Sequence, residues 1–337
     1  MIYPKFLQKG ATIGVPAVSD GSYNETSNIR FKNSIKRFEE MGYKVIPSKN
    51  LYNSVMTRSA DAITRAKEFN DMIENKDIDF LMCAAGGEFL LEILPYIDFE
   101  KIKENPKFVQ GFSDPTGIMY PITTKCDIAT IYSVNFKSFG MQNLEEDLKK
   151  DLDIISGNII EQNSFELYEE EGLERVTGLE GYNLTEKVEW KSLDGKDAKF
   201  SGRIIGGCFD NIAEIAGTKF DGGAEFVERY KEDGTIWYFD NFALSNESVI
   251  RTLWKFNELG YFKYTKGIIF GRFCFENSEL GYSIEQALKD SVISKLNIPI
   301  IYDADISHKG PSFTIINGAL AEVDIKDKKG KIKLELK

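Results

Sequence analysis

The chain contains the stretch Gly111-Phe112-Ser113-Asp114-Pro115-Thr116-Gly117, which follows an apolar run from Phe108 and precedes apolar residues at helical spacing. This order predicts a strand, a tight turn and a helix. At such a turn the Ser113 hydroxyl stands clear of the backbone beside the helix N-terminus, where free N–H groups and the helix dipole favour an oxyanion. The arrangement suits a nucleophile. Because serine and aspartate also cap helices and proline suits a first helical turn, plain capping is the alternative.

The composition is that of a globular protein with an excess of acidic residues. The chain has 337 residues and a formal net charge of −11, and its length suits two domains. The acidic residues are spread widely, which argues against nucleic acid or a membrane as a partner, because both favour clustered basic charge. No apolar run is long enough to span a bilayer, and the N-terminus lacks the apolar core of a signal peptide, so we expect a cytoplasmic protein.

The residues available for thiol, imidazole or metal chemistry are few. The four cysteines, Cys83, Cys126, Cys208 and Cys274, are far apart, and no pair has the spacing of metal ligands. We expect buried free thiols in a reducing compartment and no metal site. His308 is the single histidine, so a mechanism that needs an imidazole must use it.

The order of strand and helix patterns predicts two α/β domains. Over residues 1–157 the patterns alternate with short links, which predicts a flavodoxin-like parallel sheet covered by helices. Residues 158–199 lose this alternation and are interpreted as a linker with an ordered insertion. Residues 200–337 predict a smaller C-terminal α/β domain with mixed strands, in which Gly202–Gly207 is interpreted as a strand that runs into a glycine turn.

Two features follow neighbouring predicted strands of the first domain. Gly86-Gly87 follows the third strand, and Ser113 follows the fourth. Ligands of parallel α/β sheets bind outside the carboxyl ends of the strands, so both features are expected on the ligand side. The glycine pair lacks the spaced third glycine of a dinucleotide fingerprint, and no Walker-type lysine follows it, which disfavours a nucleotide cofactor.

A serine hydrolase mechanism accounts for these residues on chemical grounds. Free serine is a poor nucleophile and needs an adjacent base, which His308 would supply, oriented by Asp240. The backbone N–H groups of Gly87 and Asp114 would stabilise the developing oxyanion. Each side chain also has an ordinary structural explanation, because a loop histidine commonly lies at the surface and an aspartate after a strand commonly belongs to a turn.

Several stretches in this order resemble the LD-carboxypeptidase family of serine peptidases. The family includes murein tetrapeptide carboxypeptidases and the hydrolases that confer self-immunity to microcin C. The resemblance covers nearly the whole chain and rests on the order and spacing of several motifs rather than on any single one. These are Leu7–Gly14, Gly86-Gly87, Asn105–Asp114, Gly202–Gly207 and Gly267–Phe273.

The resemblance implies a Ser–Glu–His triad divided between the two domains. Ser113 falls on the nucleophile and His308 on the base, while Asp240 stands where the family has a glutamate. Aspartate fills the same role in other triads. Two further departures are Glu88, after the glycine pair, and Ser307, where the family usually has glycine. The resemblance also implies a homodimer without a metal or organic cofactor.

The expected substrate is a small peptide or peptidyl-nucleotide bound by Gly86, Glu88, Asn135 and Trp190. We expect amide cleavage of a peptidyl or aminoacyl-nucleotide conjugate through an acyl-enzyme, as in microcin C immunity. Release of terminal D-alanine from murein tetrapeptides is the alternative within the family. A small-ligand-binding protein that has lost turnover is the alternative outside it. Trp190 either packs in the fold or forms a wall that stacks on the substrate's base.

Overall fold

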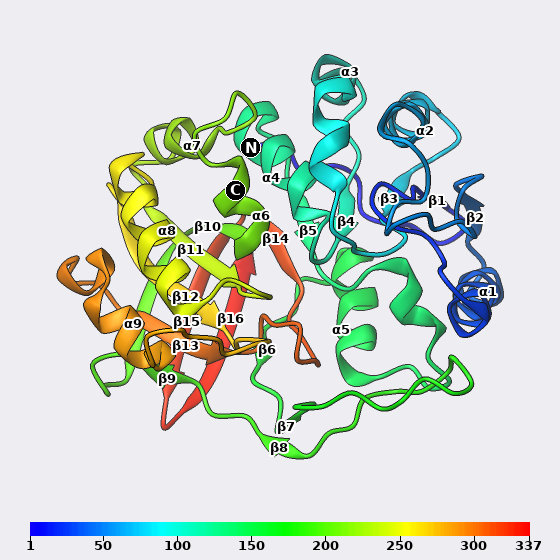
Figure 1. The fold of residues 1–337 in the computed structure, drawn as a ribbon. Helices are drawn as coiled ribbons and strands as arrows, with labels where there is room; N and C mark the ends of the chain where they lie inside the picture. Colours follow the sequence, from blue (N-terminus) through cyan, green and yellow to red (C-terminus); the bar gives the residue numbers. More distant parts are fainter. The chain divides into compact units, whose positions relative to one another are not determined.

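A computed structural model describes the whole chain, Met1–Lys337, as two compact units (Figure 1). Unit 1 comprises Met1–Ile159, Gly172–Asn183 and Thr314–Ile316, and unit 2 comprises the remaining residues. The segment interpreted as a linker with an insertion is therefore shared between the units. Its short strands, each of two residues, are β6 (Gln162–Asn163), β7 (Leu167–Tyr168), β8 (Glu186–Lys187) and β9 (Lys191–Ser192).

Unit 1 is built on a six-stranded sheet with the strand order β14-β5-β4-β3-β1-β2. Parallel pairing joins β1 through β5, which confirms the predicted parallel sheet. All residues of β1, β3, β4 and β5 are buried, as expected for parallel strands covered on both faces. The strand bounds are β1 (Thr12–Val15), β2 (Lys44–Pro47), β3 (Phe80–Met82), β4 (Val109–Gly111), β5 (Thr130–Tyr132) and β14 (Ile315–Asn317).

Helices cover both faces of this sheet, with α2, α3 and α4 on one side and α1 and α5 on the other (Figure 1). Side chains cap the longer helices: the Asn24 side chain accepts from Ser27 N, and the Asp61 side chain accepts from Thr64 N. The bounds are α1 (Glu25–Glu40), α2 (Ala62–Glu74), η1 (Leu90–Tyr96), α3 (Phe99–Glu104), α4 (Thr116–Cys126), η2 (Phe136–Gly140) and α5 (Glu146–Ile155).

Unit 2 contains an eight-stranded mixed sheet with the order β6-β16-β15-β10-β11-β12-β13-β9. Its four central strands, β10 through β13, are parallel, and antiparallel strands flank them on both sides. The mixed C-terminal sheet is therefore confirmed. The bounds are β10 (Ala198–Cys208), β11 (Thr235–Asp240), β12 (Thr265–Gly271), β13 (Ile300–Ala304), β15 (Leu320–Lys326) and β16 (Lys329–Glu335).

The connections of the parallel strands in unit 2 contain helices. Ser245 and Ser283 cap α8 and α9 through their hydroxyls, which accept from Ser248 N and Gln286 N. No helix anywhere in the structure is both long enough and apolar enough to cross a membrane. The helix bounds are α6 (Phe209–Ile215), α7 (Gly223–Arg229), α8 (Asn246–Glu258), α9 (Ile284–Asp290) and η3 (Val292–Lys295).

The glycine turn expected at Gly206-Gly207 is wrong, because β10 continues through both residues to Cys208. A Cβ at Gly206 would lie 1.9 Å from the Tyr238 carbonyl oxygen of the neighbouring strand β11. Glycine is required there by the close approach of two backbones, and not by a reversal of the chain.

Candidate active site

Ser113 lies at the turn between β4 and α4, as predicted. Its φ of +67° is in the left-handed region, which non-glycine residues seldom adopt and which is frequent in turns that carry functional side chains. Thr116 N donates to Ser113 O at 2.9 Å, which closes the first turn of the helix. A Cβ at Gly111 would lie 2.5 Å from Pro115 Cβ, so the tightness of the turn requires glycine before it.

Two buried side chains hold this turn. Asn135 accepts from Phe112 N at 3.0 Å and donates to Phe112 O at 3.0 Å, so both ends of its amide bind the residue before the serine. The Asp114 carboxylate accepts from the Ser19 hydroxyl and, at 2.9 Å, from Leu90 N. Asn135 was expected to bind substrate, and here it supports the turn. Ser19 was not predicted, and the only signal for it was a polar loop after the first strand.

Gly86-Gly87 lies against the serine turn. A Cβ at Gly86 would lie 3.2 Å from Ser113 Cβ and 3.4 Å from its Oγ, and a Cβ at Gly87 would lie 2.2 Å from Ser19 Oγ. The absence of side chains therefore lets the two turns approach each other, and the glycine backbone faces the serine. Glu88, the next residue, is exposed.

Asp240 and His308 form a hydrogen-bonded pair in unit 2. Asp240 ends β11 and is completely buried, and its Oδ1 lies 2.9 Å from His308 Nδ1 and accepts from His308 N at 3.2 Å. With the proton on Nδ1, the imidazole donates to the carboxylate, and Nε2 carries the lone pair of the ring. The Phe242 ring packs on the imidazole at a centroid distance of 4.7 Å. Asp240 thus reaches His308 although it is one methylene shorter than glutamate.

A buried ion pair supports the loop that carries His308. Arg272 Nη1 lies 2.5 Å from Asp305 Oδ1, and its Nη2 donates to Lys309 O at 2.7 Å and to Pro311 O at 3.0 Å. Burial raises the pKa of Asp305, and Arg272 opposes that shift. The Ser307 hydroxyl donates to Arg272 O at 2.6 Å. Ser307, which stands where the resembled family usually has glycine, therefore also supports the loop.

Trp190 belongs to this support and not to a substrate wall. The indole is completely buried, its Nε1 donates to Asp305 Oδ2 at 2.9 Å, and its ring packs against Phe313 with centroids 5.7 Å apart. A Cβ at Gly330 would lie 2.1 Å from the indole. These contacts correct the expectation that Trp190 stacks on a substrate, because they leave no open ring face.

We predict that Asp305→Asn destabilises the protein by about 3–5 kcal/mol, because it leaves the Arg272 charge buried without its partner. The measurement is the urea midpoint of unfolding. Glu40→Gln is the matched control, because it breaks the exposed Lys36–Glu40 pair at 3.7 Å and should change stability by less than about 1 kcal/mol. Equal small effects of the two substitutions would contradict a supporting role for the buried pair.

The cysteines do not compete for the role of nucleophile. All four are free, and burial raises the pKa of Cys83 to about 12 and that of Cys274 to about 11. Because the thiolate is the reactive form, these thiols are inert at neutral pH. No group of three or more His, Cys, Asp or Glu side chains is placed to hold a metal ion.

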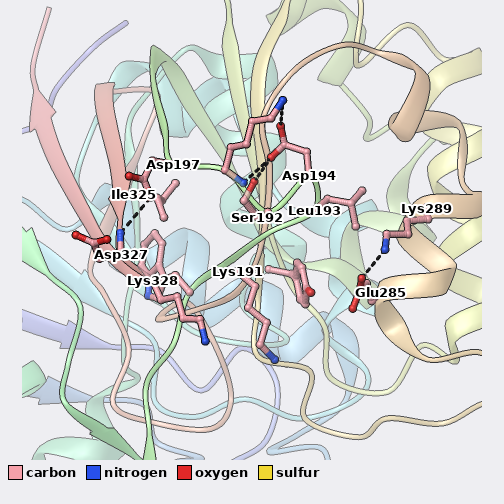
Figure 2. Close-up of a pocket in the computed structure, with 14 residues that line it drawn as sticks. Lys191, Ser192, Leu193, Asp194, Asp197, Glu285, Lys289, Ile325, Asp327 and Lys328 are labelled. Carbon is pink, nitrogen blue, oxygen red and sulfur yellow. Dashed lines mark hydrogen bonds and ion pairs between the residues drawn. The ribbon is translucent and has the colours of Figure 1, made fainter.

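Two surface cavities of unit 2 differ in their relation to His308. One, of about 490 Å³, is lined by Arg272, Cys274 and Lys309, and so borders the histidine loop. The other, of about 780 Å³, is drawn in Figure 2 and includes none of the predicted catalytic residues. Its charges pair with one another, as Glu285 does with Lys289 at 2.5 Å. Neither cavity is lined by Ser113, Asp240 or His308.

Comparison with known families agrees with this geometry. The model of the LD-carboxypeptidase N-terminal domain matches residues 13–133, and that of the LD-carboxypeptidase C-terminal domain matches residues 201–323. The chain belongs to the LD-carboxypeptidase family and is a hydrolase of the carboxypeptidase class.

Two kinds of relatives are similar over nearly their whole length. The microcin C7 self-immunity protein MccF of Escherichia coli is 25% identical over 333 residues, which cover 96% of this chain and 93% of MccF. A solved structure of MccF with aspartyl sulfamoyl adenosine has a TM-score of 0.81 at 23% identity and covers 100% of both chains. A muramoyltetrapeptide carboxypeptidase from Oxalobacter formigenes has a TM-score of 0.72 at 20% identity, covering 96% of this chain and 98% of its own. The structural likenesses show a shared fold.

Proposed function

We propose that Ser113, His308 and Asp240 form the catalytic triad of a serine carboxypeptidase that cleaves the amide of a small peptidyl or aminoacyl-nucleotide conjugate. The observation that supports this most strongly is the 2.9 Å contact between His308 Nδ1 and the buried Asp240 carboxylate. That contact orients an imidazole as a triad requires. The left-handed turn at Ser113, beside a glycine turn, supports the assignment of the nucleophile.

The proposed reaction forms and then hydrolyses an acyl-enzyme. Ser113 Oγ attacks the amide carbonyl while His308 Nε2 takes the hydroxyl proton, and Asp240 stabilises the imidazolium. The backbone N–H groups of Gly87 and Asp114 bind the tetrahedral oxyanion, for which loss of one donor typically costs about 3–4 kcal/mol in barrier. His308 then gives its proton to the leaving nitrogen, and water, activated by the same imidazole, releases the acid.

The contact between Asp240 and His308 also favours turnover over ligand binding alone. The substitution of aspartate for the family's glutamate was the one sequence feature that suggested a protein without activity. Since the shorter carboxylate still lies within hydrogen-bonding distance of Nδ1, this feature no longer argues for inactivity.

For the substrate class, similarity to MccF favours an aminoacyl-nucleotide or peptidyl-nucleotide. The two sequences match over 96% of this chain, and MccF has been solved with aspartyl sulfamoyl adenosine. The higher TM-score, 0.81 against 0.72 for the muramoyltetrapeptide enzyme, points the same way. Murein tetrapeptide cleavage is the second candidate, favoured by the fold shared with the Oxalobacter formigenes enzyme.

The test is kcat/KM of one enzyme preparation on aspartyl sulfamoyl adenosine and on murein tetrapeptide. We predict a preference of about tenfold or more for the nucleotide conjugate, equivalent to roughly 1.4 kcal/mol of additional transition-state binding. A clear preference for the tetrapeptide would assign the protein to murein processing instead. Because Trp190 is buried, the preference is expected to arise from other residues.

A further inference from the structure

Most buried or partly buried cations of unit 1 have partners within the fold. Arg65 donates to Val18 O at 3.1 Å and to Glu92 at 2.8 Å. Arg30 donates to Glu180 O at 3.0 Å. Lys107 donates to three carbonyl oxygens at the end of α2, at 2.5 Å, 2.6 Å and 3.1 Å. Each of these three cations therefore donates hydrogen bonds to oxygen atoms of the protein, as expected for a charge that is removed from water.

Lys137 is the exception. Its amine forms neither a hydrogen bond nor an ion pair, and it lies 4.7 Å from the centre of the Tyr23 ring and 5.7 Å from that of Phe31. Burial, helped by Arg175 and Arg30, lowers the pKa of this amine to about 8, so most of it still carries a charge at neutral pH. The charge of the Asp20 carboxylate opposes this lowering of the Lys137 pKa, but no hydrogen bond joins the two side chains. Asp20 Oδ1 instead accepts from Gly21 N at 2.8 Å.

The backbone places Lys137 at the ligand edge of the sheet. Lys137 N donates to Ala84 O at 3.1 Å, two residues before the Gly86-Gly87 turn. Asn135, two residues before Lys137, holds the residue that precedes Ser113. The amine is also near the loop of Asp20, whose Cβ would lie 3.2 Å from a Cβ at Gly87. A half-buried cation without a hydrogen-bond or ion-pair partner therefore belongs to the same edge as the serine and glycine turns.

We propose that Lys137 binds the anionic group on the leaving half of the substrate. This inference rests on the proposed function. A carboxypeptidase substrate carries a terminal carboxylate next to the scissile amide, and a nucleotide conjugate carries a phosphoryl or sulfamoyl group in the corresponding place. In a protein with a net charge of −11, such a group needs a dedicated cation, and Lys137 is a half-buried one that no carbonyl or carboxylate of the protein binds. Lys137 is thus a specificity-determining residue.

The experiment compares wild type and variant on paired substrates, one with and one without an anionic group beside the scissile amide. One pair is a peptide with a free carboxyl terminus and its C-terminal amide. The other is aspartyl sulfamoyl adenosine and the aspartyl amide of 5′-amino-5′-deoxyadenosine, which keeps the scissile bond and lacks the sulfamoyl group. For Lys137→Met we expect KM to rise about ten- to hundredfold for the anionic member of the pair that the enzyme uses, because a charge-assisted hydrogen bond is lost. We expect kcat, and KM for the neutral member, to stay close to wild type.

Two variants serve as controls. Lys137→Arg keeps the charge and should restore most of the affinity. Lys149→Met removes an exposed lysine from α5 and should leave both substrates unaffected, which separates a local contact from a change in net charge. Thermal unfolding of each variant checks that the fold is intact.

Calorimetric binding to Ser113→Ala keeps this test separate from the proposed chemistry. If wild type does not turn over either class, the proposed function fails, while a selective loss of affinity for the anionic ligand in Ser113→Ala/Lys137→Met still supports the anion contact. Equal weakening of anionic and neutral ligands, or no weakening of either, overturns the role of Lys137. The anionic ligand that loses affinity shows whether Lys137 binds a carboxylate or a sulfamoyl group.

Discussion

Ser113→Ala is expected to lower kcat by roughly a millionfold, because loss of a triad nucleophile leaves only the oxyanion hole and substrate binding. The same substitution should abolish labelling by a serine-directed phosphonate, which intact-mass analysis would show as a single adduct on the wild type. The setting of Ser113 motivates both expectations, since its left-handed φ of +67° places it at a tight strand-to-helix turn.

The matched control for the nucleophile is Ser156→Ala, which removes a serine hydroxyl at the end of α5, away from the turn. This variant should label and turn over like wild type. Labelling of Ser113→Ala to the wild-type extent would exclude Ser113 as the nucleophile. A protein that only binds its ligand would show no adduct in any variant.

His308→Gln is expected to abolish turnover, because the chain contains no second imidazole. Asp240→Asn should lower kcat by about ten-thousandfold, since an amide in place of the carboxylate favours the wrong imidazole tautomer. The measurements are kcat and kcat/KM for wild type and both variants.

Asp240→Glu is the control for the acid of the triad, because it keeps the carboxylate and introduces the residue that the family resemblance implies. It should retain far more activity than Asp240→Asn. Thermal unfolding must accompany both, since the Asp240 side chain is completely buried. Wild-type turnover in His308→Gln, or equal activity of the two Asp240 variants, would contradict the proposed triad.

Local sequence patterns were sufficient for the parallel sheet and the serine turn. The apolar run before Ser113 and the helical spacing after it reflect interactions between residues close in sequence. These interactions form regardless of where the segment lies in the fold. The same holds for the helix caps at Ser245 and Ser283. Hydrophobic periodicity and capping depend on residues three or four positions apart, so one sequence can reveal them.

Pairwise contacts between distant segments were decided only by the tertiary structure. Asp240 and His308 are 68 positions apart, and their pairing was proposed from family resemblance and chemistry, whereas the 2.9 Å contact follows from how β11 and the loop after β13 lie in the fold. Trp190 has the same sequence signal as an exposed aromatic, yet it is buried against Asp305 and Phe313. Lys137 carried no signal at all.

The contacts of Asp240, His308, Trp190 and Lys137 are made with segments that are remote in sequence. The proposed role of Lys137 in specificity depends on its partial burial and on the absence of a carbonyl or carboxylate that binds its amine. A glycine pair becomes part of a strand when a neighbouring backbone lies as close as Tyr238 does to Gly206. The sequence by itself determined which chemical groups were available and where the chain would turn. The tertiary structure decided their partners, because burial and close approach depend on the packing of the whole unit.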